Sequence, residues 1–149
     1  MNRETDVPVF GRQVEGCPYI VQPSAYALVR REGDELAIAR TAIGYFLPGG
    51  GLKAGETSEQ AIEREAMEEC GLVLRPRSLL GRAIQIVYSP AENACFEKQS
   101  SFIEADLLGL ESLTDGDHQL VWFTVGHAIE ALFHESHRWA VGRLIVKTA

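Results

Sequence analysis

The stretch from Gly49 to Leu72, GGGLKAGETSEQAIEREAMEECGL, constrains the fold of this chain more than any other stretch. A run of glycines leads into a segment with helical periodicity, and Gly71 stands where a glycine commonly ends a helix. Six of the 21 acidic residues fall between Glu56 and Glu69, and Arg64 is the only basic residue among them. The stretch therefore predicts a helix that needs a neutralising partner for its carboxylates.

We expect this helix to run from about Ser58 to Cys70. Thr57 and Gln60 have the spacing of a capping box at its beginning. Residues three and four apart share a helix face, so the apolar ridge consists of Ile62, Ala66 and Cys70.

Glu65, Glu68 and Glu69 lie within an arc of about 100° beside this ridge. Like charges at such spacings destabilise an exposed helix by roughly 0.2–0.5 kcal/mol per pair, and the negative end of the helix dipole adds to this cost. A divalent cation reverses both effects, and magnesium and manganese prefer carboxylate and carbonyl oxygens. We therefore expect the three carboxylates in a partly enclosed pocket at the core edge, with Glu59 and Glu63 in solvent.

The composition is that of one soluble domain spanning residues 1–149, with residues 1–16 as an irregular N-terminal arm. The sequence contains no run of about 18 apolar residues, so we expect no membrane span. The first residues lack the apolar core of a signal peptide. We therefore expect a cytoplasmic protein. The net charge of −7 argues against duplex nucleic acid as a partner but not against nucleotides.

The three cysteines, Cys17, Cys70 and Cys95, are odd in number and far apart, without CxxC spacing. We expect them to be reduced and mostly packed, and a zinc site built from them is disfavoured.

The remaining pattern indicates alternating strands and helices of an α/β (α+β) protein. Strands are expected at residues 24–31 and 35–40 as a hairpin, at 43–47, at 79–89 and 99–108 with a loop at 90–93, and at 120–124. Helices are expected at residues 125–133 and 136–146. The order β-β-β-α-β-β-β-α-α predicts a mixed sheet with helices on both faces.

The central stretch matches the pattern G-x5-E-x7-R-E-U-x-E-E-x-G-U, where U is aliphatic. The match comprises Gly50, Glu56, Arg64, Glu65, Glu68, Glu69, Gly71 and Leu72. Seven fixed identities at these spacings arise by chance roughly once in 10⁸–10⁹ starting positions. The chain thus resembles the Nudix hydrolases. The one departure, Ala66 in place of a larger aliphatic residue, concerns packing and leaves every polar position intact.

The resemblance implies an α/β/α sandwich with a central mixed sheet over nearly the whole chain. It also implies hydrolysis of a phosphoanhydride in a nucleoside diphosphate linked to another moiety, with Mg²⁺ as cofactor and Mn²⁺ as a substitute. The leading substrate is a nucleoside triphosphate, an oxidised one included, cleaved to the monophosphate and pyrophosphate. ADP-ribose, nucleotide sugars and dinucleoside polyphosphates stay open, as does a homodimer.

The resemblance implies that the matching positions would have the roles of the corresponding family residues. The metal ligands would be the carboxylates of Glu65, Glu68 and Glu69 and the backbone carbonyl of Gly49. Glu56 would support the site through a metal-bound water or by pairing with Arg64, and Arg64 would hold the carboxylates in place. Glu65 is one candidate general base, and a residue of a later loop is the other.

Residues outside the central stretch are weaker candidates. A further acidic metal ligand would be Asp117, its neighbour Asp115, or Glu97, and each of these can equally be part of a solvated turn. Arg40 is a candidate phosphate contact or plain surface. Aromatic candidates for stacking on a base are Tyr45, Phe46, Tyr88 and Phe96, although most aromatic residues at strand spacing belong to a core. The histidines form no metal-spaced set with the central helix, and His134 and His137 are expected on the closing helices.

Two alternatives to an enzyme remain. A Nudix-like sensor would bind a nucleotide without cleaving it, but such domains commonly lose carboxylates that this chain keeps. An acidic helix without any ligand is the other alternative.

Overall fold

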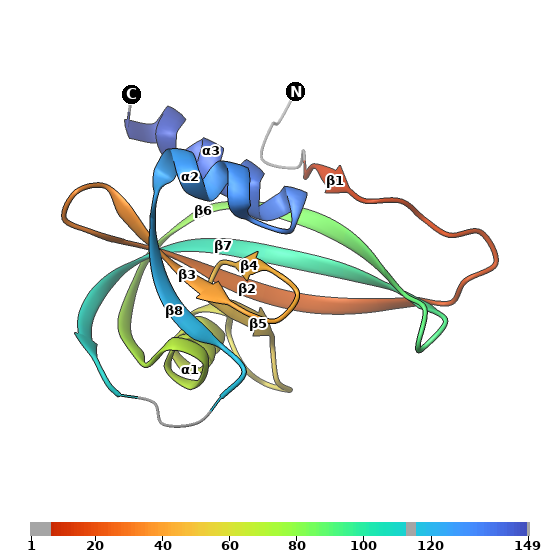
Figure 1. Cartoon of the computed structure of the whole chain (residues 1–149). Coiled ribbons are helices and arrows are strands. Elements are labelled where there is room, and N and C mark those ends of the chain that lie inside the picture. Colours follow the sequence, from red (N-terminus) through yellow and green to blue (C-terminus); the bar gives the residue numbers. More distant parts are fainter. Residues whose placement is uncertain (1–6, 113–115, 149) are drawn as a thin grey trace.

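The computed structural model describes residues 7–112 and 116–148, with side chains up to residue 145. In chain order the elements are β1 (Val9–Phe10), β2 (Tyr19–Arg31), β3 (Glu35–Arg40), β4 (Tyr45–Phe46), β5 (Gly49–Gly51), α1 (Ser58–Cys70), β6 (Leu72–Ser89), β7 (Ala94–Leu110), β8 (Gln119–Thr124), α2 (Val125–Ala131) and α3 (Glu135–Thr148). Figure 1 shows α1 on one side of the strands and α2 and α3 on the other.

The strands form one mixed sheet. Its order is β1-β6-β7-β2-β3-β4, with β5 paired to β2 and β8 paired to β3. The β2–β7 pair is parallel, whereas β6 and β7 form a long antiparallel hairpin. This arrangement confirms the predicted α/β sandwich with a central mixed sheet.

Residues 24–29 of the central strand β2 are buried on both faces, which explains the continuous apolar run from Ala25 to Val29. Ala25, Ala27 and Val29 belong to the core cluster on the side of α1. Tyr26 and Leu28 belong to the cluster on the side of α2 and α3. The two faces of β2 thus separate the core into two layers.

Helix α1 has the predicted bounds because both of its ends are encoded locally. The Thr57 hydroxyl accepts from the Gln60 N–H, and the Gln60 side chain accepts from the Thr57 N–H, which completes the capping box. Gly71 ends the helix with a left-handed φ of 67°. The apolar ridge is buried and Glu59 and Glu63 are exposed, as predicted.

Several strand bounds differ from the prediction. β2 begins at Tyr19 instead of residue 24, and β6 and β7 are longer than expected because their backbones pair from Leu72–Leu110 to Ser89–Ala94. These added residues include polar side chains, so backbone pairing defines strands that side-chain alternation does not reveal.

The expected strand at residues 43–47 is wrong in its extent. It is reduced to β4, and the glycines that were expected to end it form β5, in which Gly50 pairs with Ala25. A Cβ atom at Gly49 would lie 2.1 Å from the Ala25 carbonyl oxygen, so only glycine permits this pairing. The closing helices, α2 and α3, occur near their predicted positions with shifted ends.

Within the described residues, no helix is long and apolar enough to cross a membrane. All three cysteines are free thiols, and Cys70 and Cys95 are buried, in agreement with the sequence.

Candidate active site

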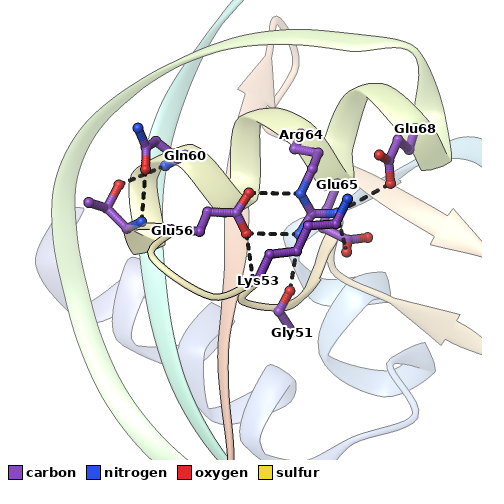
Figure 2. A network of polar contacts seen from close by, with 8 residues as sticks. Gly51, Lys53, Glu56, Gln60, Arg64, Glu65 and Glu68 are labelled. Carbon is purple, nitrogen blue, oxygen red and sulfur yellow. Dashed lines mark hydrogen bonds and ion pairs between the residues drawn. The ribbon is translucent and has the colours of Figure 1, made fainter.

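Arg64 is the centre of a polar network in which the loop before α1 meets the carboxylates of the helix (Figure 2). Its Nε and Nη2 atoms donate to the two oxygens of Glu56, over 2.8 and 2.9 Å. Its Nη1 donates to Glu65 over 2.8 Å and to Glu68 over 3.3 Å, and its Nη2 also donates to the Gly51 carbonyl over 3.1 Å. Paired hydrogen bonds of this kind restrict both distance and orientation. Arg64 therefore orients Glu65 and Glu68 relative to β5.

Glu56 is ionised over the whole neutral range. The Arg64 guanidinium and, to a smaller extent, the backbone N–H of Lys53, 2.9 Å from the carboxylate, together lower the pKa of Glu56 to about 2. A carboxylate that stays charged keeps the guanidinium in a fixed orientation.

Glu69 has a different environment at the end of the same helix. Its Oε1 accepts a hydrogen bond from the Gly49 N–H over 2.9 Å, and its Oε2 lies 3.1 Å from Nε2 of His118. Burial above all, together with repulsion by Glu65 and Glu68, raises the pKa of Glu69 to about 8. A carboxylate in such surroundings gains strongly from a neighbouring divalent cation.

Strand β5 approaches α1 closely because it consists of glycine. A Cβ atom at Gly50 would lie 3.0 Å from Cδ of Glu65, which is tighter than ordinary van der Waals contact. The backbone of β5 and the carboxylates of α1 thus form adjoining walls of one site.

The candidate ligand atoms of Glu65, Glu68, Glu69 and the Gly49 carbonyl are all oxygen atoms, which hard divalent cations prefer. The Glu65 and Glu69 side chains are 20% and 14% exposed, as expected for a partly enclosed pocket, whereas Glu68 is 56% exposed. Among the described residues, no three His, Cys, Asp or Glu side chains already converge as a metal centre. Arg64 contacts one oxygen each of Glu65 and Glu68, which leaves their second oxygens for a cation.

A cavity of about 720 Å³ opens beside Glu69, and this volume is typical of a site for a small molecule. Its lining residues are Tyr26, Thr41, Ala42, Ile43, Phe46, Leu47, Gly49, Gly50, Glu69, Val87, Lys98, Asp117, His118, Phe133 and His134. The carboxylate end of α1 is therefore one wall of a largely apolar cavity.

The structure places some of the weaker candidates in the cavity and others outside it. Asp117 lines the cavity together with Glu69. Asp115 lies outside the described residues. Glu97 is not part of the cavity lining and accepts a hydrogen bond from Gln99 over 2.9 Å. Arg40 is exposed at the end of β3 and does not belong to the lining either.

Among the four aromatic candidates, Phe46 lines the cavity and the other three do not. Tyr45 packs edge-on against Phe123 at 4.9 Å between ring centroids. Tyr88 lies at the tip of the β6–β7 hairpin, where its hydroxyl donates to Asn93 over 3.3 Å. These contacts explain two of the aromatic side chains without a ligand.

Several cavity residues were missed by the sequence analysis, namely Lys98, His118, Phe133 and His134. None of them belongs to the motif, and only His118 had a visible signal, as the neighbour of Asp117. The expectation that both histidines lie on the closing helices is wrong for His134, which lies between α2 and α3, and correct for His137, which lies on α3. Both side chains are buried, and the His137 ring packs against Tyr26 on the side of the sheet that α2 and α3 cover. The His137 Nδ1 accepts a hydrogen bond from the Leu47 N–H over 3.2 Å.

The two buried histidines are neutral at pH 7. Burial lowers the pKa of His134 to about 4 and the pKa of His137 well below its ordinary value, and the charge of Lys98 contributes to both shifts. They therefore contribute aromatic surface and neutral polar atoms to this side of the sheet.

Comparison with known proteins agrees with this geometry. A family model described as NUDIX domain matches residues 20–142. An ADP-ribose pyrophosphatase of Methanocaldococcus jannaschii is 51% identical over 37 residues, which are 25% of this chain and 22% of that protein's length. The local match to this relative therefore spans about a fifth of its length.

Solved structures share the fold at low sequence identity. A NUDIX hydrolase from Nitrosomonas europaea superposes with a TM-score of 0.68 at 18% identity, over 85% of this chain and 89% of the other. The E. coli dihydroneopterin triphosphate pyrophosphohydrolase superposes with a TM-score of 0.67 at 16% identity, over 84% and 95% of the two chains. The family model covers most of the chain and the fold agrees with it, so this protein belongs to the NUDIX domain family.

Proposed function

We propose that the protein is a Nudix pyrophosphohydrolase that cleaves a phosphoanhydride bond in a nucleoside diphosphate linked to another moiety. The observation that carries this proposal is the meeting of the carboxylates of α1 with a small-molecule cavity. Glu69 belongs to both, and Gly49 and Gly50 of β5 form the adjoining wall. A diphosphate needs charge neutralisation and room for its organic part. The carboxylates would hold the cation that neutralises the charge, and the cavity offers the room.

Members of this family generally need divalent metal ions. Mg²⁺, with Mn²⁺ as a substitute, would be held by Glu65, Glu68, Glu69 and the Gly49 carbonyl oxygen. When bound, the ion supplies charge neutralisation on the diphosphate oxygens and a more acidic bound water. Arg64 orients Glu65 and Glu68 through its hydrogen bonds, and Glu56 orients Arg64 in turn. Glu65 is one candidate base to accept a proton from the attacking water, and a residue of a later loop is the other.

The leading substrate is a nucleoside triphosphate, an oxidised one included, with the monophosphate and pyrophosphate as products. The volume of the cavity and its aromatic lining support a nucleotide of this size. ADP-ribose, nucleotide sugars and dinucleoside polyphosphates are the alternatives within the same chemistry. The match to the M. jannaschii ADP-ribose pyrophosphatase keeps the first of them open.

The test is a panel of nucleoside triphosphates, 8-oxo forms, ADP-ribose, nucleotide sugars and dinucleoside polyphosphates, assayed for released phosphate or pyrophosphate in Mg²⁺ and in Mn²⁺. At least one substrate is expected to turn over, and EDTA is expected to abolish turnover. Persistent activity in excess EDTA would contradict the metal-dependent mechanism.

Variants of α1 make this test specific. Loss of a residue that merely orients a metal ligand costs 10- to 100-fold, so Glu68→Gln and Glu69→Gln are expected to lose about 100-fold or more. Glu63→Gln removes an exposed carboxylate from another side of the same helix and is expected to keep full activity. Unchanged rates in the first two variants would refute the proposed ligand set. Nucleotide binding without cleavage across the whole panel would favour a sensor instead.

A further inference from the structure

The cavity has two ends of different chemistry. Gly49 pairs with Tyr26 of β2, and Lys98 pairs with Gln22, so the two cavity residues are about 13 Å apart along this strand. The carboxylate end contains Glu69 and the glycines of β5. The opposite end contains Lys98, beside the buried histidines.

The electrostatic relationships agree with this separation. The charges that act on Glu69 are those of Glu65, Glu68 and Arg64. The charge of Lys98 acts on His134 and His137 instead. Lys98 is thus close enough to the buried histidines to affect them, and the strand register places it away from Gly49.

Among the described residues, Lys98 has no carboxylate as an ion-pair partner. It is half-buried, and burial lowers the pKa of its amino group. Among the residues that the structure describes, no carboxylate forms an ion pair with it, and it is the only lysine or arginine in the cavity lining. A partly desolvated ammonium group gains most from an acceptor that a ligand brings.

The wall beside Lys98 is aromatic. The rings of Phe46, Phe133 and His134 surround one another, with centroid distances of 5.4, 5.2 and 5.3 Å. Phe133 is 53% exposed although it is a large apolar side chain. Exposed aromatic rings next to a cavity suit a flat heterocycle, which stacks on their faces. A nucleobase stacked there would present its polar edge towards Lys98.

We infer that Lys98 recognises a carbonyl oxygen of the nucleobase, so that the enzyme prefers guanine, hypoxanthine, uracil or thymine over adenine and cytosine. An ammonium group donates hydrogen bonds and accepts none. Guanine and thymine offer an exocyclic oxygen where adenine and cytosine carry an amino group. An amino group facing Lys98 would leave two donors without an acceptor. This inference rests on the proposed function and specifies the substrate class of the same site.

The experiment compares kcat/KM for the four ribonucleoside and the four deoxyribonucleoside triphosphates in wild type and in Lys98→Met. The kcat/KM of wild type is expected to be about tenfold or more higher for guanine, uracil and thymine nucleotides than for adenine and cytosine nucleotides, because hydrogen bonds to charged groups discriminate to this extent. Lys98→Met should lose roughly 10- to 100-fold on those bases and little on adenine and cytosine. Arg82→Met is the matched control, because it removes an exposed positive charge outside this cavity and should preserve the preference.

Two results with Lys98→Met would overturn the inference. An equal loss on all bases would mean that Lys98 contacts the phosphates or the sugar, and an unchanged preference would mean that it does not reach the base. If Lys98→Met does not fold, as judged by circular dichroism, Lys98→Gln replaces it. An amide both donates and accepts, so this variant is expected to equalise the bases.

A binding measurement separates this inference from the proposed function. Calorimetric titration with GMP, UMP, AMP and CMP requires no turnover, and the inference predicts tighter binding of GMP and UMP. If no substrate of the whole panel is hydrolysed but this preference is found, the proposed function fails and base recognition by Lys98 stands. Hydrolysis without any base preference would refute the inference alone.

Discussion

Nε2 of His118 lies 3.1 Å from Oε2 of Glu69, which links the segment before β8 to the end of α1. The other oxygen of Glu69 accepts the hydrogen bond from the Gly49 N–H. The most buried of the three candidate ligands is thus held from two sides by residues distant in the sequence. The pKa of the Glu69 carboxyl therefore depends on these contacts, which exist only in the folded protein.

The first prediction concerns stability against pH in the metal-free protein. The folded-state pKa of Glu69 is about 8 and its ordinary value is 4.5, so between these values the folded state binds more protons than the unfolded state. The contribution of Glu69 to the free energy of unfolding is therefore expected to decrease as pH rises from about 4.5 to 8, whereas the lowered pKa values of His134 and His137 act in the opposite sense below about pH 6.5. Urea unfolding in EDTA at several pH values measures this slope. Glu69→Gln should remove this contribution, and identical slopes in wild type and variant would contradict it.

The second prediction concerns Arg64. Lysine cannot form the paired hydrogen bonds that Arg64 makes with Glu56, so Arg64→Lys is expected to lower kcat about 10- to 100-fold. The pKa of Glu56 should rise from about 2 towards its ordinary value, which an NMR titration detects. Arg31→Lys, in the exposed pair with Glu35, is the control and should leave both measurements unchanged.

The third prediction separates two neighbouring glycines. Gly50→Ala would push against the Glu65 carboxylate, so it should lower activity more than stability. Gly49→Ala would collide with the backbone of β2 at Ala25 and Tyr26, so it should decrease the free energy of unfolding by about 3 kcal/mol or more. Parallel assays of kcat and of chemical unfolding test both. The pairing of β5 with β2 would be contradicted by a fully stable Gly49→Ala protein.

The fourth prediction compares two acids outside the motif. Asp117 lines the cavity and Glu97 does not, so Asp117→Asn is expected to reduce kcat/KM about tenfold and Glu97→Gln less than about twofold. The metal concentration for half-maximal activity should increase in the first variant only. The reverse pattern would assign the additional acidic role to Glu97.

The residues of α1 illustrate what could be predicted from sequence. Thr57, Gln60 and Gly71 define the ends of the helix through contacts within a few residues, so its bounds follow from the local sequence. The spacing of the carboxylates likewise follows from the helical repeat. The motif then predicted the family and the sandwich fold, which the family model and the fold comparison confirm. A single domain over residues 1–149, a homodimer and a cytoplasmic location stay predictions.

The sequence by itself determined the carboxylate face of α1, because helix ends and helix faces depend on neighbours along the chain. Tertiary structure alone decided what lies opposite that face. Glycines 49–51 form a strand because they pair with β2 at a distance that leaves no room for a side chain at Gly49. Lys98, His118 and Phe133 line one cavity because strands and loops distant in sequence converge there. Long-range packing has no local code, so the reaction class could be predicted from a motif, whereas the residues proposed to select the base required the assembled fold.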